Sequence, residues 1–218
     1  MIEFKTPLEM YNDFVKDVVA TAPPVILEIG AREAMFSKHC SLALANSKVF
    51  AFEASPHNYR VYSEACKNFN MQYLNYAVGA GDGVAEFFIN SVINGEAIPA
   101  DTGRNSLLPR TSAAIASTVP VQVITIDHFL AEKGLRGQPL AVWIDVEGAT
   151  GDVLRGMEAS LKYVDSLFVE VEEKRFWENQ WLRKDVEECL ALHGLKAVAR
   201  DFEYADDGQY NMMFKRNP

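Results

Sequence analysis

The segment from Val25 to Ser37, VILEIGAREAMFS, constrains the fold of this chain more than any other stretch. An apolar run passes through an acidic residue and Gly30 into a helical segment, which predicts a buried strand, a tight turn and the start of a helix. Gly30 allows either a backbone conformation or a close ligand approach that a side chain would block. The turn predicts a ligand at the first amides of the helix, although an ordinary turn without a ligand fits this stretch equally well.

The composition excludes several classes of protein. With 218 residues, 49% of them hydrophobic, the chain can bury a full core, so we expect one globular domain over residues 1–218. The formal net charge of −9 argues against a nucleic-acid partner, because phosphate binding requires clustered Lys and Arg. Three scattered cysteines without CxxC spacing argue against a disulfide framework or a zinc site. The sequence shows no secretory or membrane-spanning pattern, so we expect a soluble, cytoplasmic protein.

Apolar strands and amphipathic helices alternate along the chain, which predicts a mostly parallel α/β sheet with helices on both faces. Two closing strands, over residues 196–204 and 209–215, can pair through Asp206-Asp207-Gly208 and add one antiparallel strand. Residues 84–126 interrupt the alternation as an inserted extended segment, in which residues 90–117 have the composition of a long loop. The other expected elements are an N-terminal helix within residues 1–22, helices over 36–45, 126–132 and 184–193, helices from Pro56 and around Leu154, and strands over 49–53, 71–78, 140–145 and 167–173.

Acidic residues gather where the expected strands end. The carboxyl ends of parallel strands meet at one edge of a sheet, and ligands bind there. Glu53, roughly 20 residues after the glycine turn, suits the two hydroxyls of a ribose, although a solvated strand-end carboxylate is the alternative. No GxGxxG triple is present in the sequence, which favours an adenosine cofactor without phosphates over NAD. The strand-end carboxylates are Glu28, Glu53, Asp145, Glu147, Glu170, Glu172 and Glu173.

Five separated motifs carry a resemblance to a known family. They are Glu28-Ile29-Gly30-Ala31 with Phe36-Ser37, residues 49–56 (VFAFEASP), residues 75–79 (NYAVG), residues 105–108 (NSLL), and residues 144–149 (IDVEGA) followed by 153–156 (VLRG). Together they resemble the FkbM-type S-adenosylmethionine-dependent methyltransferases. The chain departs from the family pattern at Ala34, where a second glycine is usual, and at Thr150-Gly151, which replace an acid.

The resemblance implies a Rossmann-like class I methyltransferase fold, with a mostly parallel, twisted seven-stranded sheet, one antiparallel strand and helices on both faces. It also implies S-adenosylmethionine as the cofactor. Gly30 and Ala31 would pass closest to this cofactor, Glu53 would hold its ribose, and Asp145 would lie near its methionine part. Ala54 and Tyr76-Ala77 would flank the adenine. The implied cofactor-binding residues are Glu28, Gly30, Ala31, Ser37, Glu53, Ala54, Tyr76, Ala77 and Asp145.

Asp145 and Glu147 are the candidate catalytic residues. If the strand geometry persists, their side chains share one face, so one can orient the reactants while the other accepts the proton of a hydroxyl. Glu147 fits a helix-capping carboxylate equally well. Glu170 and Glu172 also share a face, where a divalent metal or a sugar hydroxyl could bind, and a solvated edge fits at least as well. We assign no metal.

The leading hypothesis is an O-methyltransferase acting on a hydroxyl of a sugar or another small natural-product acceptor, with no nucleic-acid or membrane partner. A homo-oligomer is left open. A nicotinamide-dependent oxidoreductase is the enzyme alternative, favoured by Glu53 but disfavoured by the missing glycines and by the lack of a Tyr-x-x-x-Lys pair. A non-catalytic adenosine-binding or scaffolding domain is the other alternative, motivated by Ala34 and Thr150.

Overall fold

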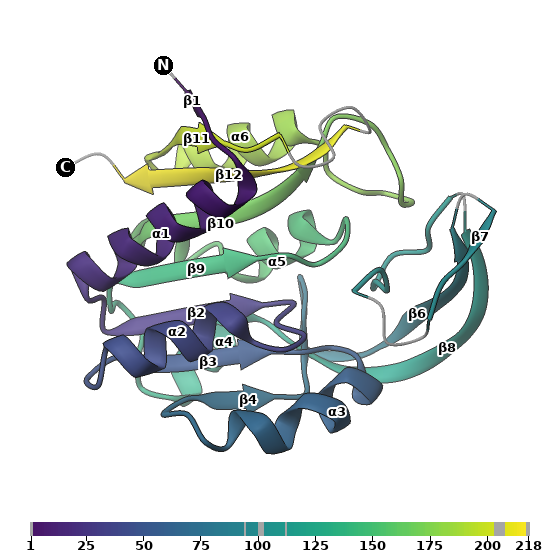
Figure 1. The fold of residues 1–218 in the computed structure, drawn as a ribbon, viewed down its shortest axis with the longest axis horizontal. Helices are drawn as coiled ribbons and strands as arrows, with labels where there is room; N and C mark the ends of the chain where they lie inside the picture. Colours follow the sequence, from purple (N-terminus) through teal and green to yellow (C-terminus); the bar gives the residue numbers. More distant parts are fainter. Residues whose placement is uncertain (1, 94, 100–102, 112, 203–207, 217–218) are drawn as a thin grey trace.

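Two β-sheets organise the chain (Figure 1). The computed structural model describes residues 2–93, 95–99, 103–111, 113–202 and 208–216. In spatial order, the larger sheet contains β1 (Glu3–Phe4), β11 (Leu195–Arg200), β12 (Gln209–Arg216), β10 (Val164–Glu172), β9 (Leu140–Ile144), β2 (Val25–Ile29), β3 (Lys48–Phe52) and β4 (Gln72–Leu74). The smaller sheet contains β5 (Ala77–Val78), β8 (Ala113–Ile124), β6 (Gly83–Ile93) and β7 (Glu96–Ala97).

The larger sheet confirms the predicted mostly parallel arrangement with one antiparallel strand. β12 runs antiparallel to β10 and β11, whereas the other pairs in this sheet are parallel. The sheet has eight strands rather than seven, because Glu3 and Phe4 pair with Ala199 and Arg200 at the edge. The hairpin of β11 and β12 is confirmed, and the Asp206 and Asp207 of its expected turn lie outside the described residues.

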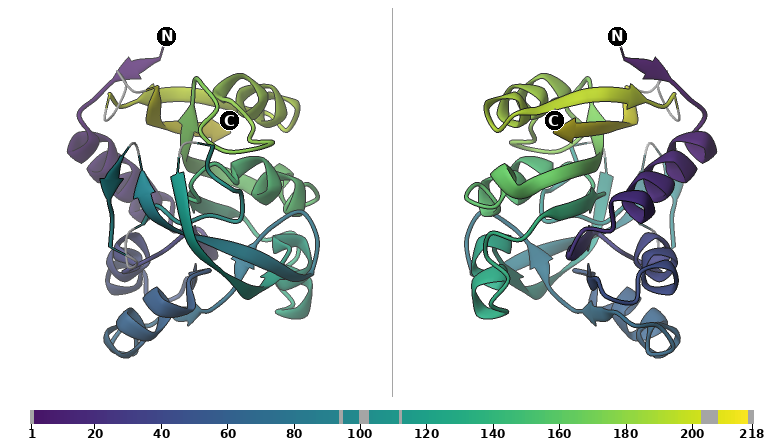
Figure 2. Two further views of the ribbon diagram at one scale, coloured as in Figure 1. Left: turned by 90° about the vertical axis from the view of Figure 1, so that its right-hand side faces the viewer. Right: turned by 90° about the vertical axis from the view of Figure 1, so that its left-hand side faces the viewer.

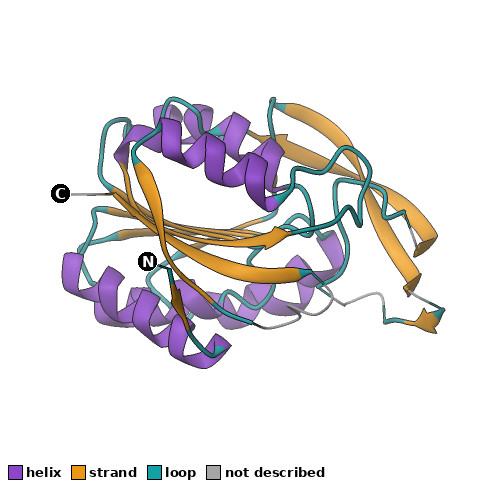
Figure 3. Cartoon of the chain, turned by 90° about the horizontal axis from the view of Figure 1, so that it is seen from above, coloured by secondary structure: helices purple, strands orange, loops and turns teal. Residues whose placement is uncertain are grey.

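Helices cover both faces of the larger sheet, which gives the three layers seen from above in Figure 3. One face carries α1 (Pro7–Thr21), α2 (Met35–Ala43) and α3 (Pro56–Cys66), and the other carries α4 (Ile126–Glu132), α5 (Thr150–Gly156) and α6 (Arg183–Leu192). A 3₁₀ turn, η1, spans Leu161–Tyr163. Because side chains alternate along a strand, β2 sends Val25, Leu27 and Ile29 to the core under α4 to α6 and sends Ile26 to the core under α1 and α2. None of the helices in the described part of the chain combines the length and apolar character that a membrane crossing requires.

The strand expected over residues 71–78 is wrong as a single element. It divides into β4 in the larger sheet and β5 in the smaller one. Between them, the side-chain amide of Asn75 donates to the carbonyl oxygens of Glu53 (2.7 Å) and Ala54 (3.3 Å). The Asn75 side chain thus bonds to the end of β3, at the point where the chain leaves the larger sheet.

The loop expected over residues 90–117 is wrong at both ends. β6 continues to Ile93 and β8 begins at Ala113, and the two strands pair antiparallel along their length. Within the expected loop, residues 94, 100–102 and 112 lie outside the described residues. The view onto the carboxyl ends of the parallel strands, on the left of Figure 2, shows β6 and β8 crossing in front of that edge. The inserted segment therefore stands over the edge where ligands bind in such sheets.

Candidate active site

The carboxyl ends of β2, β3, β9 and β10 open into a cavity of about 1130 Å³. This volume exceeds that of a typical pocket for one small ligand, roughly 300–1,000 Å³, so the cavity has room for a cofactor and an acceptor. The inserted segment and the chain after β10 complete the walls. The sequence-predicted site residues that line the cavity are Gly30, Glu53, Ala54, Tyr76, Ala77, Asp145 and Glu147.

Position 30 needs a glycine, because the backbone that follows the neighbouring strand lies too close for a side chain. Its φ is +82°, and a Cβ atom at this position would lie 1.7 Å from the carbonyl oxygen of Asp145. Its N–H group donates to the carbonyl oxygen of Phe52 (3.0 Å). The glycine therefore allows the ends of β2 and β9 to approach each other, and the same turn forms part of the cavity wall.

Glu53 has a geometry that suits a ribose. It follows β3 and is only 5% exposed, and its carboxylate accepts hydrogen bonds from the backbone N–H groups of Arg32 (2.7 Å) and Ser55 (2.7 Å). Burial raises the pKa of Glu53, and these hydrogen bonds act in the opposite direction. The Asn58 side chain also donates a hydrogen bond to this carboxylate. Because a carboxylate can accept about four hydrogen bonds, acceptor capacity remains for a ribose hydroxyl.

Three predicted cofactor residues are not among those that line the cavity: Glu28, Ala31 and Ser37. The buried Glu28 carboxylate accepts hydrogen bonds from the N–H groups of Ser37 (2.8 Å) and Phe36 (3.4 Å) at the start of α2. The expectation that these amides face a ligand is therefore wrong, since a side chain of the protein occupies them. Burial raises the pKa of Glu28 to about 7.

The two departures from the family pattern have local explanations. Ala34 adopts a left-handed conformation, with φ of +58°, which accounts for the glycine that is usual at this position. It is fully buried against Ala31 and Ala51 and does not line the cavity. Thr150 is buried too, and its hydroxyl donates to the carbonyl oxygen of Glu170 (3.4 Å).

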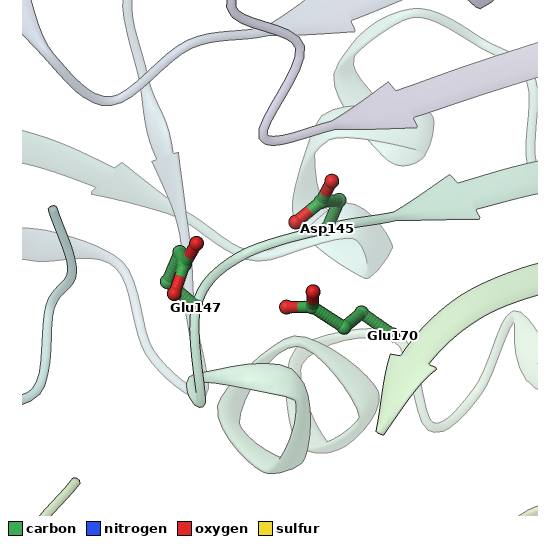
Figure 4. A group of neighbouring side chains, drawn as sticks. All are labelled: Asp145, Glu147 and Glu170. Carbon is green, nitrogen blue, oxygen red and sulfur yellow. The ribbon is translucent and has the colours of Figure 1, made fainter. Parts of the chain in front are cut away.

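Asp145, Glu147 and Glu170 point toward one another from β10 and the chain after β9 (Figure 4). An oxygen from each carboxylate lies within 4.8 Å of the others. Strand alternation is not the reason, because β9 ends at Ile144 and the backbone of Glu147 turns through a left-handed conformation, with φ of +52°. The Ser106 hydroxyl donates to the carbonyl oxygen of Glu147 (2.7 Å) and holds this turn.

The three carboxylates are partly buried, and their charges lie close together. Burial, together with the charge of Asp145, raises the pKa of Glu147 to about 8 and the pKa of Glu170 well above its usual value. One oxygen of Glu147 and one of Glu170 are buried without a hydrogen-bond partner among the described residues. The three carboxylates could therefore hold a divalent cation or accept the hydrogen of a hydroxyl group. The solvated edge considered for Glu172 is wrong, because this residue is only 1% exposed.

Arg110 was not predicted from the sequence as a residue of the site. Its guanidinium Nη1 lies 3.8 Å from an oxygen of Glu147, and the group packs over the rings of Trp177 and Phe176. Arg110 lies in a stretch with the composition of a loop, and only the folded chain brings it to the carboxylates. The neighbouring Ser106 belongs to a motif that carries the family resemblance, which is the one signal that pointed to this segment.

The fold is that of the class I methyltransferases. This class is defined by the strand order, by the antiparallel β12 and by an acid at a strand end beside a glycine turn. Comparison with known proteins agrees. Residues 28–206 match the methyltransferase FkbM domain, and the chain belongs to the FkbM methyltransferase family. It is an S-adenosylmethionine-dependent methyltransferase, as the sequence predicts.

Two proteins illustrate the likeness. The 2-O-methyltransferase NoeI of Sinorhizobium fredii is 25% identical over 167 residues, which cover 72% of this chain and 67% of NoeI. An rRNA methylase from Streptococcus thermophilus has a similar fold, with a TM-score of 0.53 and 11% identity over 98% of each chain. The second likeness concerns the fold alone.

Proposed function

We propose that this methyltransferase acts on a hydroxyl group of a sugar or another small natural-product acceptor. The observation that carries the proposal is the convergence of Asp145, Glu147 and Glu170 in the same cavity that Gly30 and Glu53 line. Carboxylates suit a hydroxyl acceptor, because they accept its hydrogen bond and can take up its proton. The name of NoeI, a 2-O-methyltransferase, also supports transfer to oxygen.

The residues at the ends of β2 and β3 would orient the cofactor. Glu53 would accept the ribose hydroxyls, Ala54 and Tyr76-Ala77 would flank the adenine, and the Gly30 turn would lie against the methionine part. When bound, S-adenosylmethionine supplies an electrophilic methyl group on a positively charged sulfonium. Asp145 lines the same cavity, and its carboxylate would favour that positive charge.

Glu147 is the proposed base. A hydroxyl is a poor nucleophile until its proton is removed, and a positioned base contributes about 10²–10⁴-fold to the rate. Because burial raises the pKa of Glu147 to about 8, its ionised form is a stronger base than an ordinary carboxylate. Asp145 is proposed to orient the reactants.

The two alternative functions are less well supported. Membership of a methyltransferase family disfavours the nicotinamide-dependent oxidoreductase. The non-catalytic domain is disfavoured because Ala34 lies away from the cavity and the three carboxylates still converge. We also propose a small acceptor rather than a nucleic acid, supported by the formal net charge of −9, and a cytoplasmic location, which fits the free thiols of the three cysteines.

The test is an incubation with S-adenosylmethionine and a panel of free sugars and glycosides, analysed by mass spectrometry. A product methylated at oxygen, formed together with S-adenosylhomocysteine, would support the proposal. Methylation of a nitrogen or carbon atom in place of the hydroxyl groups would contradict it.

A further inference from the structure

Four cationic side chains line one side of the cavity. They come from residues 103–111 and from the chain that follows β10. These two segments lie side by side, since Arg110 forms a β-bridge with Trp177 and the N–H group of Thr111 donates to the carbonyl oxygen of Phe176 (2.9 Å). The four residues are Arg104, Arg110, Lys174 and Arg175.

The Arg110 side chain is packed between neighbours and has N–H groups that are free to bind a ligand. Its side chain is 8% exposed, and its guanidinium lies 4.6 Å from the ring centroid of Trp177 and 5.4 Å from that of Phe176. The 3.8 Å separation from Glu147 is an ion pair but too long for a hydrogen bond. The buried Nε atom has no hydrogen-bond partner among the residues that the structure describes. A guanidinium fixed in this way is preorganised to donate to an oxygen-rich ligand.

The other three cations are exposed at the rim. Among the described residues, no carboxylate forms an ion pair with Arg104, Lys174 or Arg175. Burial lowers the pKa of Arg110, the charge of Glu147 acts in the opposite direction, and the nearby charge of Arg104 lowers this pKa further. In a chain with a formal net charge of −9, cations gathered on one wall of the cavity require an explanation, and an anion between them would relieve their repulsion.

We infer that the acceptor carries an anionic oxygen group, a phosphate ester or a carboxylate, which Arg104, Arg110 and Arg175 bind while its hydroxyl reaches Glu147. Cations at the rim and carboxylates within the cavity would admit such an acceptor in one orientation only. The inference rests on the proposed function, because it identifies the substrate class of the same site. The carboxylate of the cofactor is the competing ligand for these cations, and the test separates the two.

The test measures anion binding to the protein saturated with S-adenosylhomocysteine at low ionic strength. Inorganic phosphate and acetate are the probes, and the unfolding midpoint is followed as each is added. The variant is Arg104→Gln/Arg175→Gln. Its matched control is Arg60→Gln/Arg136→Gln, which removes the same charge from exposed positions that do not line the cavity. A separate titration gives the affinity of each protein for S-adenosylhomocysteine.

We expect phosphate, acetate or both to stabilise the wild-type and control proteins, with an affinity about tenfold or more weaker in Arg104→Gln/Arg175→Gln. Stabilisation by phosphate alone assigns a phosphate ester, and stabilisation by acetate as well admits a carboxylate. The inference is overturned if neither anion binds, if both double variants lose the same affinity, or if Arg104→Gln/Arg175→Gln binds S-adenosylhomocysteine tenfold more weakly. If S-adenosylhomocysteine fails to bind the wild-type protein, the proposed function itself fails, whatever the anions do.

Discussion

Glu147 adopts a left-handed backbone conformation, with φ of +52°. A residue with a side chain in a left-handed conformation costs roughly 1–2 kcal/mol, and such strain persists only where the surroundings enforce it. Here the bond from Ser106 and the close packing of Gly148 on Trp177 enforce it. The result is that a carboxylate beyond the end of β9 turns back toward Asp145 and Glu170.

Glu147→Gln tests the proposed base. The amide keeps the shape of the side chain but cannot take up a proton, so we expect turnover to fall by about 10²–10⁴-fold while cofactor affinity stays nearly normal. Asp145→Asn should weaken both cofactor binding and transfer. Single-turnover rates and a cofactor titration measure the two effects. Near-normal transfer by Glu147→Gln would leave Glu147 as a structural carboxylate.

Gly30→Ala tests the close approach of β2 and β9. The added methyl would lie 1.7 Å from the carbonyl oxygen of Asp145, in a backbone with φ of +82°, so one strand end must move. We expect the free energy of unfolding to fall by about 2 kcal/mol or more, measured by urea denaturation. Gly81→Ala is the control, because nothing lies within 4 Å of its added methyl. Equal stability of the two variants would show that the turn tolerates a side chain.

At the scale of elements, residues 103–111 connect the inserted segment to the carboxylates. Ser106 is 1% exposed, and its hydroxyl donates to the carbonyl of Glu147 and accepts from the N–H group of Leu108 (3.1 Å). Residues 103–111 therefore contact Glu147 twice, at its backbone through Ser106 and at its carboxylate through Arg110.

Ser106→Ala should lower turnover by roughly tenfold, because losing a buried hydrogen bond costs about 1–3 kcal/mol and frees the turn at Glu147. The affinity for S-adenosylhomocysteine should not change, since Glu53 and Gly30 lie elsewhere in the cavity wall. Ser117→Ala, at an exposed position in β8, is the control. A loss of cofactor affinity equal to the loss of turnover would argue for general unfolding instead.

The elements that depend on residues close together in the sequence could be predicted. Helical spacing predicted α4 at its observed bounds, and Ser55-Pro56 predicted the start of α3, where Ser55 accepts a hydrogen bond from the N–H group of Asn58. The features that were not predicted depend on contacts between residues far apart in the sequence. The extended ends of β6 and β8 follow from their pairing with each other, and the division of residues 71–78 follows the bonds from Asn75 to β3.

The residues of the site divide in the same way, into those that neighbouring sequence predicts and those that depend on distant contacts. Glu53 and Asp145 directly follow strands and could be predicted, because parallel strands bring their ends to one edge, whereas Glu147 reaches this edge through a left-handed turn. Arg110 and the cations of the rim could not, since their position depends on how residues 103–111 lie against the chain after β10. The bond from the N–H group of Ser37 to the Glu28 carboxylate could not be predicted either, because it joins the start of α2 to β2.

For the whole molecule, buried carboxylates make stability depend on pH. Burial raises the pKa of both Glu147 and Glu172 from an ordinary value of 4.5 to about 8, and that of Glu28 to about 7. Between pH values of roughly 5 and 8, the folded protein therefore binds more protons than the unfolded chain, so its stability falls as the pH rises. The contribution of these carboxyl groups to stability is complete below the pKa that they have in the unfolded chain. It is lost as the pH rises through the pKa values that they have in the folded protein.

We expect the free energy of unfolding, measured by urea denaturation, to decrease steadily between these pH values. The slope should be smaller in Glu147→Gln, which removes one of the titrating groups. Glu158→Gln, an exposed carboxylate, should keep the wild-type slope. A stability that rises with pH over this range would contradict the raised pKa values of the buried carboxylates.

We propose that S-adenosylmethionine binds at the carboxyl edge of the larger sheet, with its ribose on Glu53. The most direct test is a calorimetric titration of S-adenosylhomocysteine into the wild-type protein and into Glu53→Ala. Losing a charged acceptor should cost about 1.5–3 kcal/mol, or roughly one to two decades in affinity. Equal affinity of the two proteins would contradict this placement of the cofactor.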